Sequence, residues 1–88
     1  MTAREIKIIK AILDYLHALD HGQATEVQIH ANAFGESFGT PAPSVAELAA
    51  ALRECDARKW ITGVPGRLTN KMKWNLNDAG EAARLEMA

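Results

Sequence analysis

The chain has 88 residues, of which 48% are hydrophobic and 24% are charged. This length and composition are typical of one small globular domain and exclude a disordered chain. The net charge is −1, so no overall basic field marks the chain as a nucleic-acid binder. Any binding of a polyanion must therefore depend on where the charges lie.

Cysteine content and hydropathy exclude two further classes. Cys55 is the only cysteine, which excludes an intramolecular disulfide and a metal site built from several cysteines. The most apolar stretch, residues 6–19, is interrupted by Lys7, Lys10 and Asp14, so it is neither a membrane span nor a secretory signal. We expect a cytoplasmic protein.

Three segments have the apolar spacing of amphipathic helices. Residues 2–20 begin with Thr2 and Glu5 at capping-box spacing. Thr25 can cap a short helix over residues 26–33, and an extended piece at residues 23–25 could precede it. Residues 44–60 form the third predicted helix, which begins with the capping pair Ser44 and Glu47. The predicted inward positions of the second and third helices include Val27, Val45, Leu48, Ala49, Leu52 and Cys55.

The apolar period changes from 3.6 to 2 after the third helix. Residues 60–64 and 71–77 predict two strands joined by a Pro65-Gly66 turn. We expect Met72, Trp74 and Leu76 to face the core from the second strand. Residues 35–43 contain two glycines and two prolines and predict a loop. Asn77 or Asp78 is expected to cap a last short helix that ends near Met87.

The second half of the chain carries three short motifs in order: Trp60-Ile61, Val64-Pro65-Gly66-Arg67 and Leu76-Asn77-Asp78-Ala79-Gly80. These motifs and the element order resemble winged helix-turn-helix regulators of the MarR and PadR type. The resemblance implies one winged-helix domain over residues 1–88, of α+β class and mostly α. Its parts would be a three-helix core, a two-stranded β wing and a short C-terminal helix.

The same resemblance implies a function in DNA binding. The chain would be a small prokaryotic transcriptional regulator or a phage or mobile-element protein, with its third helix in the major groove and its wing on the flanking backbone. Two features depart from the family. The loop before the third helix is longer than the usual tight turn, and the third helix lacks a basic, amide-bearing outer face. We therefore expect the wing to contribute more than the helix.

Charges are segregated along the chain. Residues 14–56 contain seven acids and one base, whereas residues 57–77 contain five bases and no acid. A phosphate backbone responds to such a cluster, and about five phosphate contacts would give a salt slope of roughly −4 to −5 on a log–log plot. Alternatively, the lysines only keep an edge hairpin from aggregating. The residues expected to contact double-stranded DNA are Ser44, Arg53, Arg58, Lys59, Arg67, Lys71 and Lys73.

A second hypothesis is a winged helix that contacts protein and not DNA. The predicted outer side of the third helix includes alanines, which form a smooth strip where another helix can pack, although alanine also simply favours helix. The residues of this alternative face are Ala46, Glu47, Ala50 and Ala57. We expect a homodimer or a larger partner, because a monomer with such an acidic middle would bind DNA weakly. The first or the last helix could supply that contact.

The remaining residues do not predict a catalytic, cofactor-binding or metal-binding site. No catalytic, phosphate-loop or cofactor motif occurs, so we expect no enzyme, no cofactor and no small-molecule substrate. His17 and His21 have a spacing that can hold a metal, but no third ligand is adjacent and no metal site is expected. Cys55 is expected to be a small buried apolar residue. Trp60 and Trp74 are expected in the core at the base of the hairpin.

Overall fold

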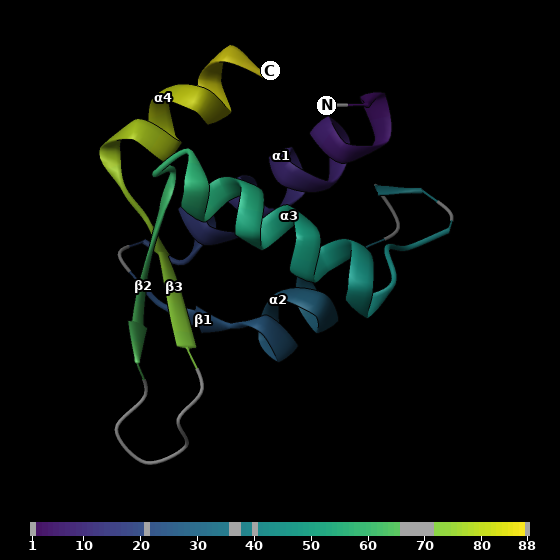
Figure 1. The fold of residues 1–88 in the computed structure, drawn as a ribbon, viewed down its shortest axis with the longest axis horizontal. Helices are drawn as coiled ribbons and strands as arrows, with labels where there is room; N and C mark the ends of the chain where they lie inside the picture. Colours follow the sequence, from purple (N-terminus) through teal and green to yellow (C-terminus); the bar gives the residue numbers. More distant parts are fainter. Residues whose placement is uncertain (1, 21, 36–37, 40, 66–71, 88) are drawn as a thin grey trace.

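The computed structural model describes residues 2–20, 22–35, 38–39, 41–65 and 72–87. These residues form four helices and one three-stranded antiparallel sheet, an α+β fold that is mostly helical (Figure 1). The elements in chain order are α1 (Ala3–Ala18), β1 (Ala24–Thr25), α2 (Glu26–Asn32), α3 (Val45–Ala57), β2 (Ile61–Pro65), β3 (Met72–Leu76) and α4 (Asp78–Glu86).

Each helix begins at a polar side chain that accepts a hydrogen bond from a backbone N–H of the first turn. On α3, the Ser44 hydroxyl accepts from the N–H of Glu47, and the Glu47 carboxylate accepts from the N–H of Ser44, both at 3.1 Å. Thr25 forms the same reciprocal box on α2. Thr2 caps α1 and Asn77 caps α4. The predicted helix starts are confirmed.

The predicted end of the third helix at Trp60 is wrong, because α3 ends at Ala57. Lys59 adopts a φ of 62°, in the left-handed region that favours glycine. The N–H of Trp60 then bonds to the carbonyl of Cys55 at 2.9 Å, which closes the helix end. No glycine occurs at this turn, so the sequence does not predict that the helix ends at Ala57.

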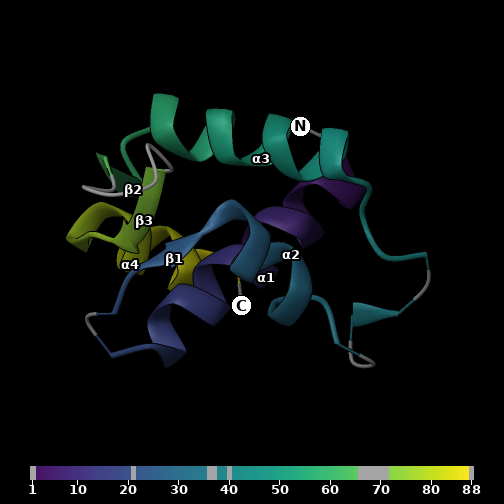
Figure 2. The same cartoon turned by 90° about the horizontal axis from the view of Figure 1, so that it is seen from below.

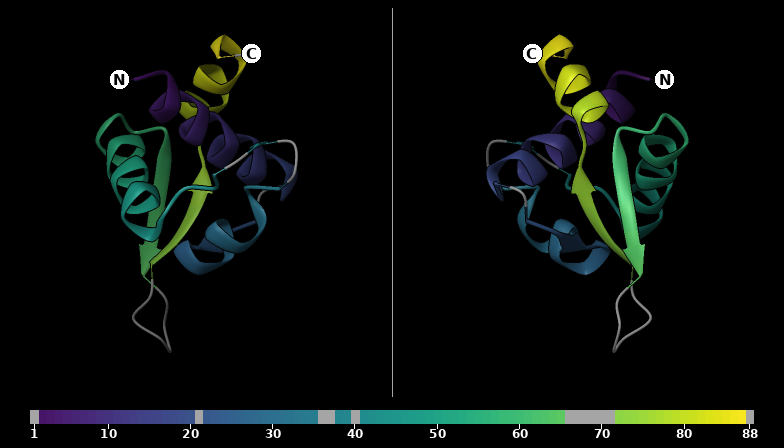
Figure 3. Two further views of the ribbon diagram at one scale, coloured as in Figure 1. Left: turned by 90° about the vertical axis from the view of Figure 1, so that its right-hand side faces the viewer. Right: turned by 90° about the vertical axis from the view of Figure 1, so that its left-hand side faces the viewer.

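The predicted two-stranded wing is part of a three-stranded sheet with the order β1-β3-β2. The extended piece expected at residues 23–25 is confirmed as strand β1, which pairs with β3 through Ala24–Trp74 and Thr25–Lys73. The β2–β3 hairpin projects away from α4 and from the first turn of α1 (Figure 3). The turn predicted at Pro65-Gly66 reaches into residues 66–71, which lie outside the described residues.

Helix α1 supplies the largest part of the core. Ile8, Ile9, Ile12, Leu13 and Leu16 are at most 2% exposed. They face α2, α3, α4 and β3, which all pack against α1. Burial of one such side chain stabilises the fold by about 1.5–3 kcal/mol, so this apolar stripe is a main source of stability.

Three predicted inward positions lie at the surface. Met72 is 43% exposed, and it stands at the hairpin end of β3. Val27 and Val45 are 63% and 61% exposed. Both lie in the first turns of their helices, whose buried side chains begin later, at Ile29 and Leu48.

The long segment between α2 and α3 is fixed against α1. Phe38 is 6% exposed, and its ring meets that of Phe34 edge-on with centroids 5.1 Å apart. The ammonium of Lys7 lies 4.7 Å above the centroid of the Phe38 ring. Nearer to α3, the carbonyl oxygen of Pro43 lies 3.0 Å from Nε2 of His30. These contacts set the path of the chain into α3.

Gly80 marks the closest approach between α4 and the start of β2. A Cβ at this position would overlap the carbonyl oxygen of Trp60 and lie 2.7 Å from Cδ1 of Leu76. We expect Gly80→Ala to destabilise the fold by about 3 kcal/mol, the upper part of the overpacking range. Urea unfolding would measure this.

Gly35→Ala is the matched control, since a Cβ there meets nothing within 4 Å. We expect a change in unfolding free energy within about 1 kcal/mol of zero for this variant. Equal stability of the two variants would contradict the close contact at Gly80.

Candidate nucleic-acid interface

The outer face of α3 carries mainly small side chains. Leu48, Leu52 and Cys55 point into the core, while Arg53 and Asp56 are the charged residues on the opposite side. Figure 2 shows α3 along one side of the molecule, so that this outer face points away from α1. The exposed set is Val45, Ala46, Ala50, Arg53, Asp56 and Ala57. One cation and one carboxylate leave this face without net charge.

Most cations of the helices are paired with carboxylates. Arg4 Nε lies 2.7 Å from Glu47, and Arg58 Nε lies 2.6 Å from Glu54. Lys10 and Arg84 are paired in the same way, at 2.8 Å from Asp14 and 2.6 Å from Glu81 respectively. These cations are therefore partly neutralised before any ligand arrives.

Three of the predicted DNA contacts are cations that have no carboxylate partner among the described residues. Within the described part of the chain, Arg53, Lys59 and Lys73 form no ion pair, and all three are exposed. Arg53 lies on the outer face of α3, Lys59 at the turn into β2, and Lys73 on β3. Unpaired, exposed cations are the groups that gain most from a phosphate.

These cations do not form one cluster. Lys73 pairs across the sheet with Val64, whereas Lys59 lies beyond the Ile61–Leu76 pair at the other end of the hairpin. The two lysines are thus separated by at least three pairs, or roughly 10 Å along the strands. Arg67 and Lys71 were also predicted as contacts, and they lie outside the described residues.

Two predicted contacts, Ser44 and Arg58, are already engaged within the chain. The Ser44 hydroxyl accepts the capping bond described above. The Arg58 guanidinium bonds to Glu54 and lies 5.3 Å from the centroid of the Trp60 ring. Either residue would have to exchange an internal partner for a phosphate.

The side chain of Glu47 is already bonded within the chain. It is half-buried and accepts two hydrogen bonds from Arg4, at 2.7 and 3.3 Å. The hydrogen bond from Arg4 and then the one from the Ser44 backbone lower the pKa of Glu47 from 4.5 to about 2. Glu47 therefore ties α3 to α1, a role that the predicted protein-contact face did not include.

An ionic chain joins α1 to α4. Arg84 donates to Asp14 at 3.3 Å and to Glu81 at 2.6 Å, and Nδ1 of His17 lies 2.8 Å from the other oxygen of Glu81. The hydrogen bond from Arg84 is the main cause of a lowered pKa for Glu81. Among the described residues no group of three potential ligands could hold a metal ion, and His21 lies outside them.

Cys55 is fully buried, as predicted. Burial raises the pKa of its thiol to about 12, so the thiol stays protonated and unreactive. Trp60 and Trp74 are partly buried and pack against the core, which confirms their predicted place.

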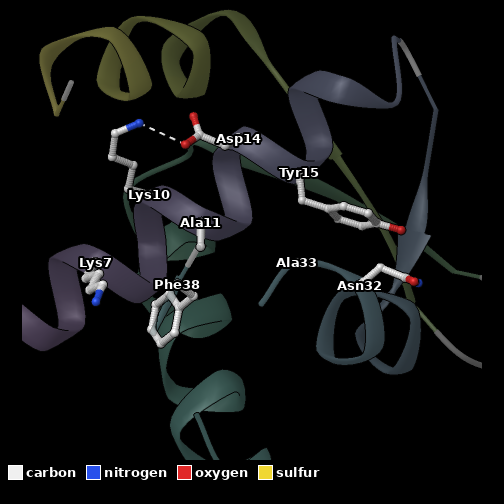
Figure 4. Close-up of a pocket in the computed structure, with 8 residues that line it drawn as sticks. All are labelled: Lys7, Lys10, Ala11, Asp14, Tyr15, Asn32, Ala33 and Phe38. Atoms are coloured by element: carbon white, nitrogen blue, oxygen red, sulfur yellow. Dashed lines mark hydrogen bonds and ion pairs between the residues drawn. The ribbon is translucent and has the colours of Figure 1, made fainter. Parts of the chain in front are cut away.

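A hollow of about 360 Å³ lies on the outer side of α1 (Figure 4). Lys10 and Asp14 bond to each other at 2.8 Å at one side of it, whereas Tyr15 points toward Asn32 at the other. The amide nitrogen of Asn32 donates to the carbonyl of Gln28 at 2.9 Å. The polar groups do not converge on one point, so the hollow does not form a ligand site by itself.

The comparisons with known proteins give no relative. No protein-family model, no curated protein and no solved structure matches the chain. No helix within the described ranges has the length and apolar character needed to cross a membrane.

The Arg4–Glu47 pair predicts a specific acid sensitivity. A carboxyl with a lower pKa in the folded than in the unfolded state stabilises the fold above its unfolded pKa, and this contribution is lost as the pH falls through the folded pKa. We expect Glu47→Gln to flatten the loss of stability between pH 4.5 and about 2. Urea unfolding at a series of pH values would measure it.

Arg4→Gln supplies the comparison, because it removes the largest cause of the lowered pKa and leaves the hydrogen bonds from Ser44 in place. It should remove part of the same loss of stability, and the double variant should have the acid profile of Glu47→Gln. An acid profile of Glu47→Gln that matches the parent protein would contradict the pair.

Proposed function

We propose that the chain is a winged-helix DNA-binding domain, acting in the cytoplasm as a small prokaryotic transcriptional regulator or mobile-element protein. The order helix, strand, helix, helix, strand, strand supports this proposal. The sheet order β1-β3-β2 adds to it, because the β2–β3 hairpin pairs through β3 with the strand that leads into α2. The winged-helix motifs quoted from the sequence agree with this arrangement.

The observation that carries the proposal is the difference between paired and unpaired cations. Four cations are paired with carboxylates: Arg4 and Lys10 on α1, Arg84 on α4, and Arg58 just after α3. In contrast, Arg53, Lys59 and Lys73 have no acidic partner among the described residues. Residues 57–77 as a whole contain five bases and no acid. A phosphate backbone supplies the negative charge that this part of the chain lacks.

Helix α3 would add close contact and little charge. Its exposed alanines allow a near approach to a groove, and alanine can touch the methyl group of thymine. Arg53 is the long donor side chain on this face, and the carboxylate of Asp56 opposes phosphates. Most of the affinity would therefore come from the hairpin and the turn before it, as the sequence predicts.

Lys73→Ala tests the contribution of the hairpin. We expect the slope of log affinity against log salt for generic duplex DNA to become about 0.9 less steep, because one phosphate contact is lost. Fluorescence anisotropy at a series of salt concentrations would measure the slope.

Lys7→Ala is the matched control. Lys7 also lacks a carboxylate partner in the described part of the chain, but it lies on α1 against Phe38, and its removal should leave the slope unchanged. No binding of the parent protein at low salt, or an equal effect of the two variants, would overturn the proposal.

A second candidate function is a protein contact through the outer face of α3. The exposed residues that favour it are Ala46, Ala50 and Ala57, together with Val45, which is 61% exposed. This face carries no net charge and would suit an apolar partner surface, including a second copy of the chain.

Ala50→Arg separates the two candidate functions. It should disrupt a protein complex or homodimer and leave the unfolding free energy of the monomer within about 0.5 kcal/mol of the parent, since the site is exposed. Sedimentation of parent and variant would show this. An unchanged oligomeric state would exclude this face as the contact.

A further inference from the structure

A cleft of about 280 Å³ lies between the first half of β3 and the start of α2. Its walls are Met72 and Trp74 of β3, together with Thr25, Glu26 and Val27 at the start of α2. Val27 is 63% exposed and Met72 is 43% exposed, while Trp74 packs in part against the core. An indole and two large apolar side chains therefore border a hollow that is open to solvent.

Gly63 of β2 allows the indole of Trp74 to lie where it does. The two residues are paired across the strands. A Cβ at position 63 would lie 2.7 Å from an indole ring carbon and 3.1 Å from the sulfur of Met72. The ring and the thioether thus rest against the β2 backbone, and this support holds the wall of the cleft in place.

We propose that this cleft takes one unpaired nucleobase, at an end or a fork of a DNA duplex. The inference rests on the proposed DNA-binding function and names the kind of DNA that the hairpin prefers. A base can stack on the indole and contact the apolar side chains of Met72 and Val27. The carboxylate of Glu26 can accept a hydrogen bond from an exocyclic amine, which favours cytosine over thymine.

One cation lies beside the cleft and is available to a phosphate backbone. Lys73 lies between Met72 and Trp74 in the strand, on the other face of the sheet, and has no acidic partner among the described residues. Strand β1 pairs with β3 only as far as Lys73, so within the described chain no strand covers this edge of β3 at Met72. A nucleic-acid backbone can pass along this edge with its phosphates near Lys73 and one base in the cleft.

The test compares three duplexes of the same sequence by fluorescence anisotropy. One is blunt, one has a short cytosine overhang, and one has an overhang of abasic nucleotides that keeps the phosphates and lacks the bases. We expect the cytosine overhang to bind about tenfold more tightly than the abasic one, as for a single base stacked on an aromatic ring. In a Trp60→Phe background, the cytosine overhang should also quench the emission of Trp74.

Two exposed apolar side chains of nearly equal exposure provide a matched pair of variants. Val27→Ala should reduce the preference for the cytosine overhang about threefold, because one apolar wall is lost. Leu85→Ala, at nearly the same exposure but on α4 and outside the cleft, should leave the preference unchanged.

The possible outcomes separate the two proposals. Binding of all three duplexes with equal affinity and no quenching would overturn the nucleobase cleft and leave the DNA-binding function in place. An absence of binding to every duplex would overturn both. Burial of Trp74 by a protein partner, with no response to any DNA, would assign the cleft to a protein contact and also overturn the inference.

Discussion

The apolar stripe of α1 is the constraint on which the rest of the structure depends. Its five nearly inaccessible side chains lie among α2, α3, α4 and β3, so each of these elements must turn one apolar side toward α1. Leu48 and Leu52 of α3, for example, are buried in the core. The faces left for a partner are the opposite ones, namely the outer side of α3 and the β2–β3 hairpin. The position of the candidate site is therefore a consequence of how the core is filled.

Charge divides the molecule into two parts with different roles. The ion pairs of Arg4 and Arg84 connect helices that are distant in sequence, and the four helices together carry a formal charge of −4. Exposed pairs of this kind contribute only about 0–1 kcal/mol each, so their main effect is to orient and neutralise side chains. Lys59 in the turn after α3 and Lys73 on β3 have no such partner among the described residues. A formal net charge of −1 conceals this difference.

Local patterns predicted much of the fold, and the deviations have physical reasons. Local patterns such as helical periodicity, capping residues and strand alternation involve neighbours in sequence. For this reason the sequence predicts the helix starts, the strand at residues 23–25 and the exposure of Arg53 and Ala50. The left-handed backbone conformation at Lys59 occurs without a glycine, so no residue type in the sequence indicates it. The exposure of Met72 depends on how far the core reaches, and the pairing of Arg4 with Glu47 joins residues 43 positions apart. None of these can be read from a local pattern. The winged-helix function and its DNA contacts stay predictions.

The contacts of Arg4 have a consequence for how the molecule is handled. Its guanidinium bonds both to the carbonyl oxygen of Pro41, at 3.3 Å, and to Glu47 in the first turn of α3. The segment that enters α3 therefore takes its position from the first turn of α1, although more than thirty residues separate the two in sequence. A tag or fusion partner attached ahead of Thr2 would act directly on this anchor. A label at the amino-terminal end therefore lies close to the first turn of α3, beside the surface under study.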